Sequence, residues 1–104
     1  MAQDKLTKWK FEKNPIVLRR MNKTGEELGE LTAVVTRIPN QGLDEIDLSS
    51  GKVNRQRLEE EIADVYAQLD ETVECLELDI DFINERIKKK RSLMQEWEAM
   101  YKGN

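Results

Sequence analysis

Apolar residues recur at helical spacing in three segments of the chain. The regular part of the first segment is Leu28, Leu31, Val35 and Ile38. The second is Leu58, Ile62, Val65, Leu69, Val73 and Leu76, and the third is Ile83, Ile87, Met94 and Trp97. Intervals of three and four residues are typical of amphipathic helices that bury one side. The pattern therefore predicts three helices, and no segment alternates as a strand would.

Local signals indicate where the first helix begins and where it ends. Pro15 suits the first turn of a helix, so we expect the first helix to start near it. Thr24, with Glu27 three residues later, offers a capping box as an alternative start. Residues 39–57 contain proline, glycines and serines without a sustained period, which predicts a long inter-helix loop.

The second helix is expected to end near Leu78, and Asp79 or Asp81 can cap the third. We therefore predict an all-α fold with a single domain over residues 1–104 and about three main helices. A chain of 104 residues that is 38% hydrophobic buries only a modest core by itself. We expect its helical bundle to be completed by self-association, as a homodimer or a homotetramer.

Composition removes several classes of chemistry. The chain contains no histidine and one cysteine, Cys75, which excludes Ser-His-Asp and Cys-His nucleophile systems and the usual zinc sites. A single cysteine forms no internal disulfide, and no export signal or membrane-spanning segment is evident, so we predict a cytoplasmic protein without a membrane partner. The net charge of −4 argues against a nucleic-acid partner.

Two acidic pairs stand out by their spacing. Glu27 and Glu30 lie three residues apart on the first helix, and Glu61 and Asp64 do so on the second. Residues three apart share a helix face. One turn further along, the same faces carry Leu31 and Val65, whereas a fully solvated face would continue with charges.

If these helices pack together, four carboxylates meet at one level and repel each other. Two like charges about 4 Å apart interact by about 4 kcal/mol at an effective dielectric constant near 20. A cation would offset this repulsion, and carboxylate oxygens suit Mg²⁺, with Mn²⁺ as a substitute. Either pair alone also fits a solvated face in a chain in which 37% of residues are charged. Their joint occurrence favours a metal site.

The segments GEELGEL at 25–31 and EEEIADV at 59–65 resemble the MazG-like nucleoside triphosphate pyrophosphohydrolases of the all-α superfamily. The resemblance extends from about Leu18 to Trp97, and the long loop is similar to an insertion in phage-type and prophage-type members. It implies a helical dimer or tetramer that hydrolyses (d)NTP to (d)NMP and pyrophosphate, in nucleotide-pool house-cleaning. The Mg²⁺ ligands that it implies are Glu27, Glu30, Glu61 and Asp64.

The resemblance also suggests which residues assist the reaction. Since no histidine is present, Glu26 or Glu60 is a candidate general base or supporting acid. The family usually holds phosphate with basic residues of the following helix, which here indicates Lys89 and Lys90 within the basic run 88–91. Trp9 is a candidate for stacking on the base. A solvated basic patch and ordinary packing are the competing interpretations of these residues.

Two further functions remain open. The apolar spacing between Leu58 and Tyr101 is close to a heptad repeat, so the chain fits a non-catalytic helical oligomerisation module. The second alternative is a member of the MazG-like family that has kept the fold, has lost hydrolysis and acts as a nucleotide-binding protein. Nucleic-acid binding through residues 86–91 is disfavoured by the acidic surroundings.

Overall fold

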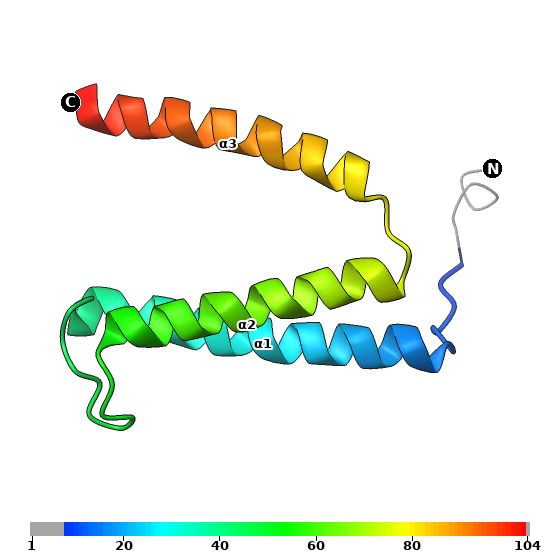
Figure 1. Ribbon diagram of the computed structural model, residues 1–104, viewed down its shortest axis with the longest axis horizontal. Coiled ribbons are helices and arrows are strands. Elements are labelled where there is room, and N and C mark those ends of the chain that lie inside the picture. Colours follow the sequence, from blue (N-terminus) through cyan, green and yellow to red (C-terminus); the bar gives the residue numbers. More distant parts are fainter. Residues whose placement is uncertain (1–7, 104) are drawn as a thin grey trace.

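The computed structural model describes residues 8–103, which form three α-helices and no β-strand. Helix α1 spans Pro15–Gln41, α2 spans Asn54–Cys75 and α3 spans Ile80–Gly103. Helices α1 and α2 run antiparallel and pack along their lengths, whereas α3 diverges from them (Figure 1). The predicted all-α class is confirmed. None of these described helices is long and apolar enough to cross a membrane.

Helix α1 begins where the sequence predicts. The side chain of Asn14 accepts a hydrogen bond from the Ile16 amide at 2.9 Å, and Pro15 occupies the first position of the helix. The alternative start at Thr24 is wrong, because this residue lies inside α1. Its hydroxyl instead shares a hydrogen bond of 2.9 Å with that of Thr72 in α2, which joins the two helices.

The loop after α1 is shorter than predicted, because it covers residues 42–53 and not 39–57. Helix α1 continues through Pro39, whose ring nitrogen leaves the Val35 carbonyl without its helical partner. Both residues are exposed, so water can bind that carbonyl. The helix stops at Gly42, which has a φ of 98° and donates its amide to Ile38 at 2.7 Å.

Helix α2 starts at Asn54, four residues earlier than its apolar pattern. The Asn54 side chain is fully buried and donates to the Gly42 carbonyl at 2.9 Å and to Gln41 at 3.2 Å. These bonds hold the end of α1 against the start of α2. At its other end α2 stops at Cys75, before Leu78, and Asp79 accepts the Phe82 amide at 3.0 Å, which confirms it as a cap of α3.

We expect Asn54→Asp to lower the free energy of unfolding by about 2–3 kcal/mol at pH 7. A carboxylate cannot donate hydrogen bonds to Gly42 and Gln41. Its negative charge would instead be buried next to the two oxygen atoms that accept from Asn54. Urea denaturation monitored by circular dichroism measures the change. The matched control is Asn22→Asp at an exposed position of α1, which should stay within about 0.5 kcal/mol of wild type. Equal stability of the two variants would contradict this role of Asn54.

The core of the chain lies between α1 and α2 and is small. Val34 and Val65 are its buried hydrophobic residues, whereas α3 contributes no buried residue. The radius of gyration is 18.8 Å, compared with about 13 Å for a compact chain of this length. The exposed area is 9302 Å², compared with about 6,100 Å² for a compact monomer of this mass. Much apolar surface is therefore left without a packing partner.

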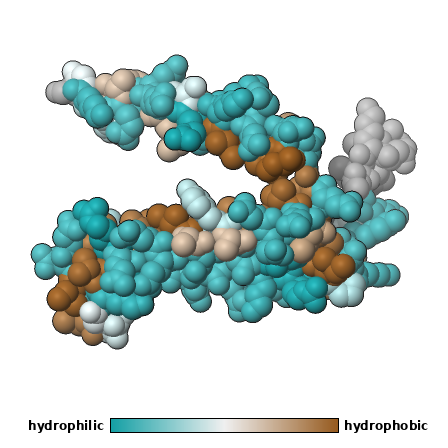
Figure 2. Space-filling view, viewed as in Figure 1, coloured by the Kyte–Doolittle hydropathy of each residue, from teal (hydrophilic) through white to brown (hydrophobic). Residues whose placement is uncertain are grey.

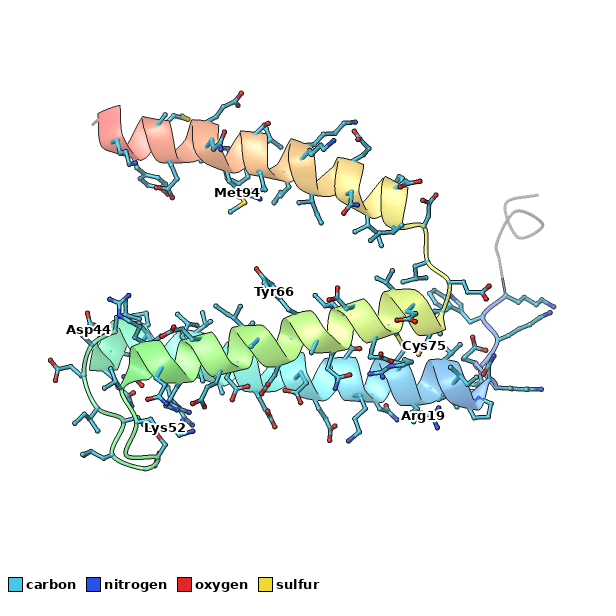
Figure 3. All side chains as sticks on the ribbon, in the orientation of Figure 1. Arg19, Asp44, Lys52, Tyr66, Cys75 and Met94 are labelled. Atoms are coloured by element: carbon cyan, nitrogen blue, oxygen red, sulfur yellow. The ribbon has the colours of Figure 1, made fainter. Side chains whose placement is uncertain are left out.

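Part of this apolar surface faces the space between α2 and α3 (Figure 2). Figure 3 shows Tyr66 of α2 and Met94 of α3 pointing into that space from opposite sides. A cleft of about 330 Å³ lies there, which we call the apolar cleft. Its lining residues are Tyr66, Leu69, Asp70 and Val73 of α2 and Ile80, Ile83, Asn84 and Ile87 of α3.

Candidate metal centre

Three carboxylates meet across the α1–α2 interface. Glu27 comes from α1, and Glu61 and Asp64 come from α2. One oxygen of each lies within 4.8 Å of the others, and we call this group the acidic cluster. Glu27 and Glu61 are half-buried, whereas Asp64 is exposed. The cluster is therefore open to solvent on the Asp64 side and closed on the helix-interface side.

Helix packing accounts for the position of the acidic cluster. Val34 and Val65 are buried between α1 and α2, and each lies within one or two helical turns of a cluster residue. Residues 61, 64 and 65 are spaced so that they share one side of α2. The apolar contact that holds the helices together therefore also brings Glu27 close to Glu61 and Asp64.

The electrostatics of the cluster are unfavourable without a cation. Partial burial raises the pKa of Glu27, and the neighbouring Glu30, Asp64 and Glu61 carboxylates raise it further. Burial likewise raises the pKa of Glu61, an effect that Glu30 and Asp64 reinforce and Arg57 opposes. One oxygen each of Glu27 and Glu61 is buried and has no hydrogen-bond partner among the described residues. A bound cation would satisfy both oxygens and remove the repulsion.

Glu30 lies beside the acidic cluster and does not belong to the group of three. It is exposed, yet its charge raises the pKa of both the Glu27 and the Glu61 carboxyl. Of the four predicted ligands, the structure thus brings three together and places the fourth next to them.

The two candidate bases are engaged elsewhere. The Glu26 carboxylate pairs with Lys23 at 3.3 Å on the surface of α1. The Glu60 carboxylate accepts from the Lys52 ammonium at 2.9 Å and from Gln56 at 3.1 Å, and the bond from Lys52 lowers its pKa. Neither residue is among the three that form the cluster.

The predicted substrate-binding residues are not brought to the cluster within residues 8–103. Lys89 and Lys90 are exposed on the diverging helix α3, where the Lys90 ammonium lies 5.2 Å from the centre of the Trp97 ring. Trp9 is fully exposed in the segment that precedes α1. Their assignment as phosphate and base contacts therefore has no support in the arrangement of this single chain.

Sequence reasoning missed a cation that does lie beside the cluster. Arg57 belongs to the first turns of α2, four residues before Glu61, and its side chain is 17% exposed. The sequence pattern assigned this residue to the loop 39–57, so we did not expect it to share a helix face with Glu61. Its position four residues before an acidic ligand candidate is the signal that would have found it.

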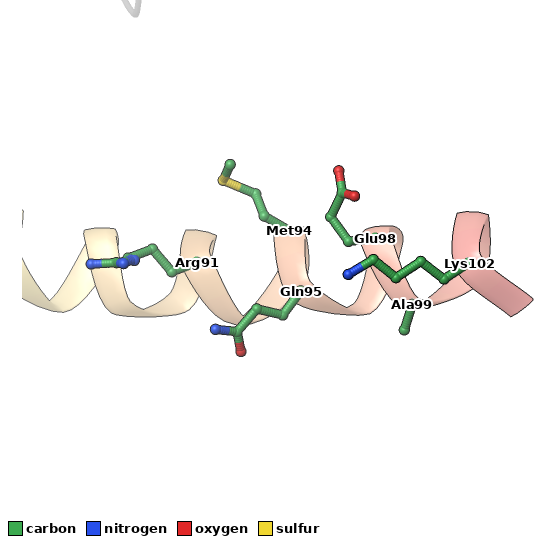
Figure 4. Close-up of a pocket in the computed structure, with 6 residues that line it drawn as sticks. All are labelled: Arg91, Met94, Gln95, Glu98, Ala99 and Lys102. Carbon is green, nitrogen blue, oxygen red and sulfur yellow. The ribbon is translucent and has the colours of Figure 1, made fainter.

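A shallow hollow on α3 is a poorer candidate for a site (Figure 4). No second element closes it, because all its lining residues come from one face of this helix. They are Arg91, Met94, Gln95, Glu98, Ala99 and Lys102. The hollow has no contact with the acidic cluster, and we assign no ligand to it.

The raised pKa values predict how pH affects the metal-free protein. A carboxyl whose pKa is raised by folding binds protons more tightly in the folded state, so stability increases as pH falls from 7 towards 4.5. The pKa values of Asp44, Asp47 and Glu60 are lowered by folding, so these carboxyls have the opposite effect on stability. They reduce the stability of the folded state once the pH falls below the ordinary pKa of a carboxyl group. Chemical denaturation at pH 5 and pH 7 measures the difference.

We expect Glu27→Gln to remove a large part of the gain in stability between pH 7 and pH 5, since it removes one of the two carboxyls that cause it. Glu59→Gln, at an exposed position of α2 outside the cluster, should keep the wild-type pH profile. A profile in Glu27→Gln identical to that of wild type would contradict the repulsion inferred within the cluster.

The acidic cluster has the donor set of a site for a hard divalent cation. Three carboxylates suit Mg²⁺ or Mn²⁺, and the open Asp64 side leaves room for water and a phosphate oxygen. The buried, unpartnered oxygens of Glu27 and Glu61 fit this interpretation. No family model, curated protein or solved structure matches the chain, so the site is interpreted from its own residues.

Proposed function

We propose that this protein is a Mg²⁺-dependent nucleoside triphosphate pyrophosphohydrolase that acts on the cytoplasmic nucleotide pool. The observation that carries the proposal is the convergence of Glu27, Glu61 and Asp64 at one open edge of the helix pair. The paired motifs that contain these residues resemble those of the MazG-like enzymes. The absence of histidine from the sequence also leaves the carboxylates as the groups for such chemistry.

In this proposal each acidic residue has a defined task. Glu27, Glu61 and Asp64 would hold the metal, and Glu30, which lies beside them, would be the fourth acidic residue of the site. Bound Mg²⁺ would neutralise the triphosphate and orient a water molecule. The water oxygen bonds to the α-phosphorus as the bond from this atom to the α–β bridging oxygen breaks. The products are a nucleoside monophosphate and pyrophosphate, and a carboxylate in or beside the cluster accepts the water proton.

The test is incubation of the protein with canonical and modified dNTPs and NTPs in the presence of Mg²⁺, with monophosphate and pyrophosphate resolved by chromatography. Equal amounts of the two products, and none in EDTA, are expected. Release of orthophosphate instead would contradict cleavage at the α–β bond. No turnover, together with no thermal shift by Mg²⁺, would favour a non-catalytic helical oligomerisation module.

We further propose that the protein works as a homo-oligomer in which a second copy covers the apolar cleft. The single chain exposes about 3,200 Å² more than a compact monomer of its mass. A standard interface buries about 800 Å² per partner, so the excess is more than enough for a stable dimer. Ile87, Met94 and Trp97 are each about half exposed on α3, although they are large and apolar.

Charge favours contact between α3 of one copy and α2 of the other. Helix α2 contains seven acidic and two basic residues, whereas α3 contains six basic and four acidic residues. Packing these helices together would therefore surround an apolar centre with opposite charges. The same contact would bring the basic run 88–91 towards a second copy. If Lys89 or Lys90 binds phosphate, it would do so at the site of that second copy.

A further inference from the structure

A triphosphate at the acidic cluster needs a cationic group besides the metal, and the single chain provides one close by. Arg57 lies one helical turn before Glu61 on α2. Its charge is close enough to lower the pKa of the Glu61 carboxyl, against the effect of burial. The basic residues of α3 do not reach the cluster in this chain, so Arg57 is the arginine that the structure places at its edge.

The Arg57 guanidinium has hydrogen-bonding capacity that the described protein does not use. Its Nη1 atom is buried, yet this atom forms no hydrogen bond with any described residue. The carboxylate of Asp47 lies 3.7 Å from this nitrogen, which is an ion-pair distance and too long for a hydrogen bond. Leaving such donors unpaired is costly unless another group binds them.

Asp47 is held by its own loop and therefore acts as a fixed neighbour of Arg57. It is 3% exposed, and its Oδ2 accepts from the Ser49 hydroxyl and the Ser50 amide, both at 2.9 Å. These bonds occupy the oxygen that faces Arg57. The aspartate can thus orient the guanidinium by charge without using its donors.

We propose that Arg57 is a phosphate-binding residue of this site and that Asp47 positions it. The inference rests on the proposed function, because it assumes that a phosphate chain enters at the acidic cluster. A guanidinium presents paired donors that match two oxygens of a phosphate group. Arg57 therefore contacts the substrate, and the loop 42–53 acts on the site through Asp47.

The test measures binding of inorganic tripolyphosphate to the full chain by isothermal titration calorimetry at saturating Mg²⁺. Arg57→Gln should raise the dissociation constant about ten- to a hundredfold, the usual loss for a hydrogen bond between charged groups. Arg57→Lys, which retains the charge without the paired donors, should raise it severalfold. Binding of Mg²⁺ alone should not be weakened in either variant, because Arg57 is not a ligand.

Arg55→Gln is the matched control. Arg55 also lies in the first turn of α2 and pairs with a loop aspartate, Asp44, at 2.7 Å, but unlike Arg57 it is not among the main charges that shift the pKa of Glu61. Its replacement should change the dissociation constant less than about twofold. Equal losses in Arg55→Gln and Arg57→Gln would show that both arginines only hold the loop, and this would overturn the proposal.

An unchanged affinity in Arg57→Gln, or no binding of tripolyphosphate to the wild type, would also overturn it. Circular dichroism verifies that each variant is folded, and Arg57→Lys provides the comparison if Arg57→Gln unfolds. Binding that depends on Arg57 without any nucleotide hydrolysis would support this inference and contradict the proposed enzyme. Nucleotide hydrolysis that persists unchanged in Arg57→Gln would support the proposed enzyme and contradict the role of Arg57.

Discussion

Asp64→Asn is expected to reduce Mg²⁺-dependent hydrolysis of the best nucleotide substrate by at least about 10³-fold. A metal ion contributes several kcal/mol to the stabilisation of the transition state, and each 1.4 kcal/mol corresponds to about a factor of ten in rate. Asparagine has the shape of aspartate but lacks the charge that the site needs to retain the ion. Because Asp64 is exposed, the substitution should leave the fold intact.

The rate is measured as release of pyrophosphate under saturating substrate and Mg²⁺. Glu74→Gln is the control, since Glu74 is also an exposed acidic residue of α2 and lies outside both the acidic cluster and the lining of the apolar cleft. It should retain activity within a few fold of wild type. Hydrolysis that persists in Asp64→Asn would refute the ligand assignment, even if the reaction itself were correctly identified.

Ile87→Asp is expected to dissociate the oligomer into monomers of 12.2 kDa. Ile87 lines the apolar cleft, and an aspartate there would be buried without a partner when a second copy binds. An uncompensated buried charge costs about 3–5 kcal/mol, which weakens association by more than about 100-fold. Light scattering after size-exclusion chromatography measures the mass over a range of concentrations.

Ser92→Asp introduces the same charge at an exposed position of α3 that does not line the cleft, and it should leave the mass at that of wild type. A wild-type protein that is monomeric at all concentrations would contradict the proposed assembly. So would an Ile87→Asp protein that retains the wild-type mass. In both cases α3 would need another explanation for its exposed apolar residues.

The sequence predicted the elements well because its apolar periodicity is strong. The period through Ile62, Val65 and Leu69 identifies α2, and Pro15 places the start of α1. The spacing also predicted that four carboxylates meet if the two helices pack together. The structure brings Glu27, Glu61 and Asp64 together and leaves Glu30 beside them. These predictions depend on local spacing and on the packing of two consecutive helices. They therefore needed little knowledge of contacts between residues far apart in the sequence.

The predicted ends of α1 and α2 were wrong for physical reasons that the spacing of apolar residues does not reveal. Pro39 lies in the last turn of α1, where a lost hydrogen bond is exposed to water, so it does not end the helix as predicted. Asn54 starts α2 through buried hydrogen bonds to the end of α1, which no local pattern reveals. Assigning residues up to 57 to a loop in turn concealed Arg57.

The placement of α3 was the least predictable feature. Its period indicates an apolar side but does not say whether α1, α2 or another chain covers that side. Lys89 and Lys90 were accordingly assigned to the site from the resemblance, and the structure of one chain leaves them on a diverging helix (Figure 1). In the proposed oligomer, their distance from the acidic cluster would depend on where the second copy binds.

Anomalous diffraction from crystals grown with Mn²⁺ would locate the divalent cation that Glu27, Glu61 and Asp64 are proposed to bind. We expect an anomalous peak within coordination distance of oxygens from all three residues, and no such peak in crystals of Asp64→Asn grown in the same way. Crystals that contain Mn²⁺ elsewhere, or nowhere, while these carboxylates remain unliganded would contradict it.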